Sequence, residues 1–249
     1  PDMEAFKSSL AFSHEDRLKP SELGRGEDAS LYEPDLRELW AFADSMSKLG
    51  ATCDVQQGFQ LKAKKALGTR IVVSSTPKPG FSKAVLSASD DYTVWELPKA
   101  EWVDLRAANV RRPGAATVLG TAQVIVNYAG PVQAWRFRPV VDAEGIAASS
   151  RFLTFRPNTT ATHSLITLWA TLLSPVANAY AYSWSSKRQT LGKEWLIFPM
   201  PTPTNAQRAE IEAVATAYLN LAMPPQAYTL TPPDEPAIKR ALLDLDAAV

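Results

Sequence analysis

The sequence predicts an α+β fold: a mixed β-sheet with covering helices, and helical extensions at both ends of the chain. Two observations carry this prediction. Between residues 117 and 155, apolar runs with β-branched or alternating residues are separated by turns. From Leu165 to Tyr180, apolar residues instead recur at helical spacing, which is typical of a helix that packs one apolar face on a sheet. The stretch from 117 to 201 therefore organises the rest of the chain.

Three strands are expected at the start of this stretch. Residues 117–128 form a β-branched run, which predicts a buried strand. Residues 132–139 follow a Gly-Pro turn and alternate apolar with polar side chains, as a half-buried strand does. Residues 148–155 follow a turn at Asp142–Gly145. We expect the three strands to form one sheet.

The apolar helix after these strands contains its own interruption. Ser174 is followed by Pro175, and proline both removes a backbone donor and disfavours helix in the residue before it. The pattern therefore predicts two helical halves. The second half leads into a polar loop at 183–193, which contains Lys187 and Arg188.

A short strand at 195–199 and a helix at 206–222 are expected next, and either Thr204 or Asn205 can cap that helix. Beyond it the chain becomes rich in proline, and a last helix is expected at 236–247.

The N-terminal part begins with a polar arm. Pro34 suits the first turn of a helix that is expected to run to Lys48, with Gly50 as its stop. Residues 51–58 read as a strand that ends in a turn. We divide the chain into an arm at 1–30, a main domain at 31–222, and a Pro-rich segment with a helix at 223–249.

Short strands and loops fill the region between this strand and the organising stretch. Residues 62–70 are a polar loop, and 71–73 form a short strand. Interrupted strands are expected within 84–97, whereas 102–112 fits no single element. A basic turn, Arg111-Arg112-Pro-Gly, then leads into the organising stretch.

Composition excludes several classes of protein. The 26 basic residues balance the 26 acidic ones, so no overall field draws the chain to nucleic acid or membrane, although a local basic face is compatible with this balance. With one cysteine, Cys53, no disulfide can form within the chain. No apolar run approaches the ~18 residues that a membrane helix needs, and no signal peptide opens the chain. We therefore expect a cytoplasmic protein.

Catalytic sites receive little support. Asp54 with Lys62 suggests a metal-dependent nuclease, but the segment has too few carboxylates for metal ligands. Cys53 could be a nucleophile with His14 or His163 as base, but its place in a predicted strand favours a half-buried structural side chain. The two Pro-Pro pairs lack the flanking amide or acid and the aromatic residue of an adenine-binding methyltransferase loop.

Basic and amide side chains in loops and at strand ends give the stronger indication. Lysine and arginine there can pair with phosphates, and Arg, Gln or Asn can read base edges, although solvated loops carry charges in any protein. The residues proposed to contact DNA are Gln56, Gln57, Lys62, Lys64, Lys65, Arg70, Asn127, Arg136, Arg151, Lys187, Arg188 and Lys193. Of these, Gln56, Gln57 and Asn127 suit adenine edges if they face the same cleft.

The order of several motifs resembles the target-recognition region of adenine-N6 DNA methyltransferases in restriction-modification systems. The first part is the strand 121–127, a Trp-Arg-Phe strand, and Arg151-Phe-Leu-Thr-Phe-Arg-Pro157. The second is the leucine-rich helix with Ser-Pro-Val-Ala-Asn, the basic loop at 187–193, and Leu196-Ile-Phe-Pro-Met-Pro201. The resemblance covers roughly residues 39–222. It departs from the pattern at Leu173, where the family usually has asparagine.

The resemblance implies a domain that grips duplex DNA and reads a short sequence, while a partner domain flips adenine. It also implies that S-adenosylmethionine binds the associated catalytic domain, with no cofactor expected in this chain. That methyltransferase domain would be fused upstream or lie on another chain. The alternative is an interaction or structural domain of the same fold, which docks on a partner through its terminal helices.

Overall fold

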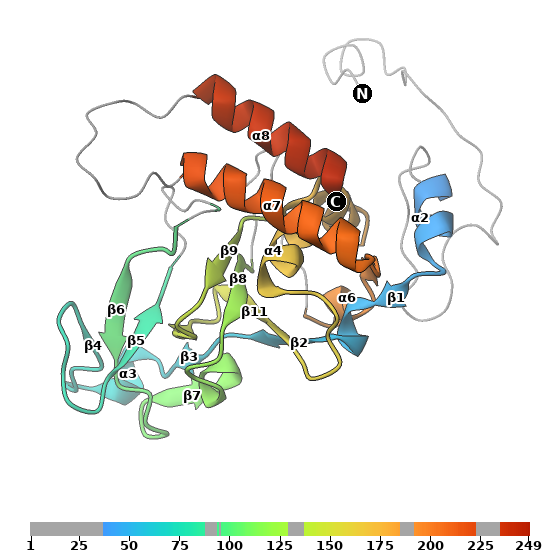
Figure 1. Cartoon of the computed structure of the whole chain (residues 1–249). Helices are drawn as coiled ribbons and strands as arrows, with labels where there is room; N and C mark the ends of the chain where they lie inside the picture. The colour runs from blue at the N-terminus through green and yellow to red at the C-terminus, as the bar shows by residue number, and fades with distance from the viewer. Residues whose placement is uncertain (1–36, 88–93, 95, 129–136, 185–191, 223–234) are drawn as a thin grey trace, which may run out of the picture. The chain divides into compact units, whose positions relative to one another are not determined.

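The computed structural model describes residues 37–87, 94, 96–128, 137–184, 192–222 and 235–249. The chain divides into two compact units, Pro1–Asp44 and Ser45–Val249. The described part of the first unit contains helix α2 (Arg37–Ala43). All other described elements belong to the second unit (Figure 1). The domain boundaries expected from the sequence stay a prediction.

A four-stranded antiparallel sheet forms the centre of the second unit. Its order is β2 (Cys53–Gln57), β11 (Phe152–Pro157), β8 (Gln123–Asn127) and β9 (Pro139–Asp142). Strand β8 is buried along its whole length, as its β-branched sequence predicts. The range expected for this strand, 117–128, is longer than the strand itself. Thr117 is the last residue of a 3-10 turn, η4 (Gly114–Thr117), and β8 begins at Gln123.

A second four-stranded sheet has the order β10 (Ala147–Ala148), β5 (Ser82–Val85), β6 (Ala100–Val103) and β4 (Val73–Ser74). Two ribbons complete the strands: β3 (Gln60–Leu61) with β7 (Val110–Arg112), and β1 (Ser47–Lys48) with β12 (Pro199–Met200). Two of the strands expected in one sheet, 117–128 and 148–155, do pair in the central sheet as β8 and β11. The second sheet is additional to that expectation, and the chain passes from it to the central sheet in the turn between β10 and β11.

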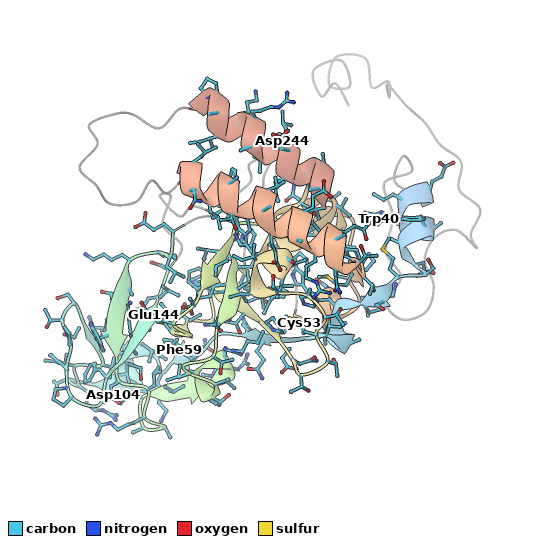
Figure 2. All side chains as sticks on the ribbon, viewed as in Figure 1. Trp40, Cys53, Phe59, Asp104, Glu144 and Asp244 are labelled. Atoms are coloured by element: carbon cyan, nitrogen blue, oxygen red, sulfur yellow. The ribbon has the colours of Figure 1, made fainter. Side chains whose placement is uncertain are left out.

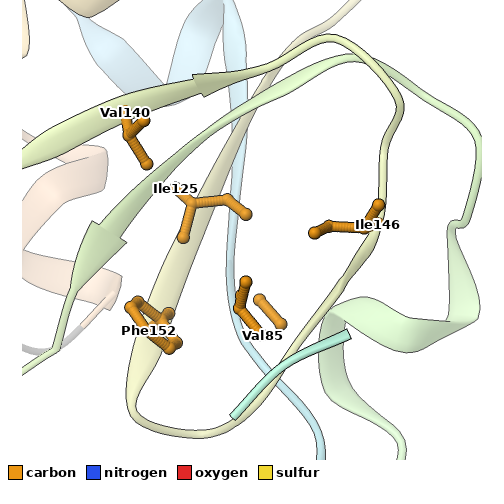
Figure 3. Close-up of a cluster of buried hydrophobic side chains, with 6 residues drawn as sticks. Val85, Ile125, Val140, Ile146 and Phe152 are labelled. Carbon is orange, nitrogen blue, oxygen red and sulfur yellow. The ribbon is translucent and has the colours of Figure 1, made fainter. Parts of the chain in front are cut away.

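One face of the central sheet packs against the second sheet. Ile125, Val140 and Phe152 of the central sheet meet Val85 and Ile146 in a buried cluster that also includes Ala148. Figure 3 shows the labelled side chains pointing toward one another, with Ile146 on the loop before β10 and the others on strands. Burial of this apolar surface is the main force that holds the two sheets together.

Helices cover the other face of the central sheet. Helix α4 (Leu165–Leu173) contacts β8, β9 and β11, and helix α6 (Gly192–Leu196) contacts β2. Trp195 of α6 is fully buried and meets the ring of Phe155 edge to face, with 5.5 Å between ring centroids. The expected strand at 195–199 is therefore wrong: its first part closes α6, and Pro199 begins the short strand β12.

The predicted break at Ser174-Pro175 is confirmed. Ser174 ends α4 in an extended conformation, with ψ at 153°, and α5 (Pro175–Trp184) begins immediately after it. The Ser174 hydroxyl oxygen accepts a hydrogen bond from the Ala177 backbone N–H at 3.2 Å, so this residue also caps the new helix.

Two long helices close the second unit. Helix α7 (Asn205–Ala222) packs on α4, and α8 (Glu235–Ala248) packs along α7 (Figure 1). Thr204 caps α7 as predicted: its hydroxyl accepts the Gln207 N–H, and Gln207 Oε1 accepts the Thr204 N–H at 2.9 Å.

The N-terminal helix is shorter than its sequence predicts. It ends at Ala43, and Gly50 lies in a 3-10 turn, η3 (Leu49–Ala51), that follows β1.

The expected loop at 62–70 contains a single helical turn, α3 (Lys64–Leu67), and the expected strand at 71–73 begins two residues later as β4. The strand expected at 132–139 and the Pro-rich segment fall largely outside the described residues.

Candidate nucleic-acid interface

Strands β3 and β7 bring together two basic segments that lie about fifty residues apart in the sequence. Gln60 of β3 pairs with Arg112 of β7, and the Lys62 N–H donates to the Asn109 carbonyl at 2.9 Å. Helix α3 follows β3 directly (Figure 1). We call the side chains gathered here the basic cluster: Lys62, Lys64, Lys65, Arg70, Arg111 and Arg112.

The neutral net charge of the chain conceals a segregation of charge. Residues 60–112 carry ten Lys or Arg and five Asp or Glu, and residues 55–89 contain no acidic side chain. The acidic surplus that balances them lies in residues 1–44, where eleven acids face five bases. The basic cluster therefore belongs to a stretch of the second unit that carries a net positive charge.

The members of the basic cluster differ in how freely they can bind a ligand. Lys64, Lys65, Arg111 and Arg112 are exposed, and within the described part of the chain no side-chain hydrogen bond or ion pair engages them. Lys62 donates from Nζ to the Ala108 carbonyl at 2.9 Å. The first four are thus free to pair with phosphate groups, whereas Lys62 also holds β3 to the segment before β7.

Arg70 has a structural function in the same cluster. Its guanidinium donates to the Ala66 carbonyl at 3.0 Å and to the Asn109 side-chain oxygen at 3.3 Å, and its Nε donates to the Leu67 carbonyl. It therefore satisfies carbonyls at the end of α3 and ties this turn to the segment before β7.

A buried carboxylate in this region is neutralised locally. Asp104, which Figure 2 shows within this region, accepts hydrogen bonds from the guanidinium and the backbone N–H of Arg106. The Arg106 guanidinium holds the pKa of Asp104 below its usual value, although burial acts in the opposite direction. Asp104 therefore remains a paired anion and does not oppose ligand binding at the exposed lysines.

Gln56 and Gln57 do not share one cleft, because successive residues of a strand face opposite sides of the sheet. Gln56 is exposed, and its Oε1 accepts a hydrogen bond from Arg156 at 3.4 Å. Gln57 is half-buried and donates from Nε2 to the Ser150 carbonyl at 3.0 Å. Asn127 is buried, and its Oδ1 accepts the Arg138 backbone N–H at 2.8 Å, which gives it a function within the fold.

The remaining predicted contacts are dispersed. Arg151 is exposed in the turn before β11, and Lys193 is exposed on α6, which packs on the opposite side of β2 from Gln56. Arg136, Lys187 and Arg188 lie outside the described residues. Of the twelve residues expected to bind DNA, the structure thus brings Lys62, Lys64, Lys65 and Arg70 together and adds Arg111 and Arg112 to them.

Sequence reasoning missed Arg156, which is 4% exposed on β11. Its guanidinium donates to Gln56 Oε1 and to the Ala115 carbonyl at 3.1 Å, and its pKa is lowered by burial. The sequence does contain a signal for this residue: Arg156 lies between two apolar strand residues, Phe155 and Pro157, and a charge in a central strand requires a partner.

A polar row crosses the central sheet next to Arg156. Asp54 lies directly opposite Arg156 on β2, and Gln123 lies opposite Asp142 on β9. Asp142 accepts a hydrogen bond from Gln123 Nε2 at 2.7 Å and three from the backbone N–H groups of residues 144–146. Burial raises the pKa of Asp142, while these four donors oppose that shift.

Among the described residues, the side chains considered as nucleophile and base, Cys53 and His163, are both buried. Burial raises the pKa of the Cys53 thiol to about 12, so the thiol is protonated and unreactive at neutral pH. His163 is buried, and its pKa is lowered mainly by that burial. Ser164, the next residue, caps α4. Among the described residues, no three side chains of His, Cys, Asp or Glu are placed to hold a metal ion. In the same ranges, no helix has both the length and the apolar character of a membrane span.

Comparison with solved structures finds a similar fold in part of one enzyme. The fold matches part of the type IIL restriction-modification enzyme MmeI, which was solved in complex with DNA. The TM-score is 0.53 at 11% identity, and the match covers 82% of this chain and 33% of that chain. The HsdS subunit from Thermoanaerobacter tengcongensis aligns with a TM-score of 0.40 at 16% identity, over 86% of this chain and 50% of that one.

The chain thus spans a third of MmeI and half of the HsdS subunit. No protein-family model and no curated protein matches its sequence. The likeness to MmeI shows a shared fold and confirms the predicted α+β class.

Proposed function

We propose that this chain binds duplex DNA and is the specificity region of a restriction-modification enzyme, with catalysis supplied by a separate domain or subunit. The observation that carries the proposal is the basic cluster. Two segments distant in the sequence converge there, and four exposed side chains, Lys64, Lys65, Arg111 and Arg112, are free to pair with phosphates.

The shared fold supports the same proposal. MmeI, whose DNA complex provides the structural match, is itself a restriction-modification enzyme, and the match covers most of this chain but a third of MmeI. A chain of this extent suits one part of such an enzyme. The catalytic part, with its own cofactor, would then lie outside these residues.

The chemistry that the partner supplies follows from the sequence resemblance. We propose that the partner is an adenine-N6 methyltransferase that binds S-adenosylmethionine and flips the target adenine while this chain holds the flanking duplex. As part of a restriction-modification enzyme, it would act in the cytoplasm, where its DNA substrate is.

Salt-dependent binding tests the proposal directly. Fluorescence anisotropy of a labelled random-sequence duplex, titrated with this chain at several salt concentrations, should show binding that weakens steeply as salt rises. The double variant K64A/K65A should bind more weakly, with a salt slope smaller in magnitude by about two, because each lost phosphate contact removes about one unit.

The matched control is K239A/R240A, which also removes two adjacent basic side chains from a helical surface, here on α8. Its salt slope should equal that of the wild type. Equal slopes for both double variants would show that the basic cluster does not contact phosphates. Absence of binding at low salt would contradict the proposed function for the isolated chain, and the same titration with the full polypeptide would then show whether the catalytic part is required.

The alternative of a partner-docking domain receives no support from a specific observation. It was motivated by the neutral net charge and by the apolar positions Leu36, Leu39, Trp40 and Ala43 of the expected N-terminal helix. Self-association measured by ultracentrifugation, together with no affinity for DNA, would favour that alternative.

A further inference from the structure

Gln56 is held more firmly than an exposed glutamine on an edge strand needs to be. Its main chain pairs with Thr154 of β11, and the Thr154 hydroxyl also donates to the Gln56 carbonyl at 3.2 Å. Its side-chain oxygen accepts from the buried Arg156. An exposed glutamine normally samples many rotamers, whereas hydrogen bonds hold both the backbone and the side-chain oxygen of Gln56.

Arg156 is in turn fixed by the turn that follows β7. Its second terminal nitrogen donates to the Ala115 carbonyl in η4. That turn approaches β2 closely because Gly114 has no side chain: a Cβ there would lie 2.4 Å from the Gln57 carbonyl oxygen. One arginine therefore links β11, Gln56 and η4.

The same turn connects Gln56 to the basic cluster. Arg111 and Arg112 precede Gly114 by three and two residues, and Gln60, four residues after Gln56, pairs with Arg112. Gln56 and these two arginines are thus tied to the same turn.

The hydrogen bond from Arg156 decides which end of the Gln56 amide faces outward. Arginine has donors and no acceptor, so it binds the amide oxygen and leaves Nε2 with both of its protons available. In the major groove, purine N7, guanine O6 and thymine O4 accept such a donor, whereas cytosine presents a donor of its own at N4.

We propose that Gln56 donates to a base acceptor in the major groove and so rejects cytosine, and that Arg156 is its positioning residue. This inference rests on the proposed function and deepens it, because it assigns one base contact to a side chain separate from those that bind phosphate. It predicts one position of the target at which cytosine is rejected.

The experiment is selection of bound duplexes from a random library by the full chain, with wild type, Q56A and Q56E compared. Wild type should select against cytosine at one position. Q56A should lose roughly five- to tenfold of that preference, as expected for one base contact. Q56E presents acceptors only and should favour cytosine there, since carboxylates accept from cytosine N4.

The control for the added negative charge is Q207E, because a glutamate keeps the α7 cap that Gln207 forms. It should leave the preference unchanged. The variant R156K keeps the charge but cannot bridge Gln56 and Ala115, so it should weaken the preference at the same position and leave the salt slope of random-duplex binding unchanged.

An unchanged base preference in both Q56E and Q56A, with salt-dependent binding intact, would overturn this inference and leave the proposed function standing. Enrichment of no base by the wild type would also overturn it. Absence of salt-dependent binding in the wild type and in all variants would overturn both this inference and the proposed function. Because Gln56 is exposed, its variants remain informative even if R156K fails to fold.

Discussion

The charged side chains of the central sheet and of the basic cluster differ in burial and in the number of their hydrogen-bond partners. In the sheet, Asp142 is fully buried, and four N–H donors surround it. In the basic cluster, Lys64, Lys65 and Arg112 are exposed, and no described side chain engages them. A charged side chain with several internal partners therefore stabilises the fold, whereas an exposed charged side chain without an internal partner is available to a ligand.

The largest effect is expected in the central sheet. D142A would leave Gln123 and three backbone N–H groups without their acceptor in a buried place, so the free energy of unfolding should fall by roughly 3–5 kcal/mol. Urea unfolding followed by circular dichroism measures this. E144Q, which alters an exposed ion pair with Lys83, should change it by less than about 0.5 kcal/mol. Similar losses in the two variants would remove the contrast.

A second comparison isolates the close approach of η4 to β2. Gly114 and Gly68 both have positive φ, at 47° and 61°. A Cβ added at position 114 would meet backbone atoms, whereas one at position 68 would meet nothing within 4 Å. Alanine should therefore cost about 1 kcal/mol at position 68 and roughly 2–4 kcal/mol at position 114. The difference between G114A and G68A in urea unfolding measures the contact, and equal costs would mean that η4 can move away freely.

The buried thiol predicts a pH dependence of the fold. The pKa of Cys53 is about 12 in the folded chain against an ordinary value of 9.0, so the unfolded chain loses this proton first. Stability from this group is complete below pH 9 and is lost as pH rises toward 12, by at most about 1.4 kcal/mol per pH unit. Between about pH 9 and 11, the free energy of unfolding of C53A should decline less steeply with pH than that of the wild type. Parallel curves would show that the thiol is accessible.

The smallest effect on stability is expected at the basic cluster. K64A/K65A should change the free energy of unfolding by less than about 0.5 kcal/mol, because both side chains are exposed and α3 tolerates alanine. This variant should nevertheless show the reduced salt slope for DNA described above. A loss of several kcal/mol in the urea experiment would assign these lysines to the fold and weaken the contrast with the sheet.

The sequence by itself determined the features that depend on neighbours along the chain. The break at Ser174-Pro175 follows from the geometry of proline, and the Thr204 cap follows from its spacing to Gln207. The strand at Cys53–Gln57 and the buried strand at Gln123–Asn127 follow from residue type and apolar pattern. The α+β class follows from the order of these elements.

Tertiary structure decided what depends on residues far apart. The pairing of β3 with β7 joins the two halves of the basic cluster, and no local pattern indicates it. Trp195 sits in a helix because its ring fills the space above Phe155, which overrides its preference for a strand. The burial of Asn127 and the bond from Arg156 to Gln56 likewise depend on sheet register and on what covers each face, and these are set by the packing of the whole fold.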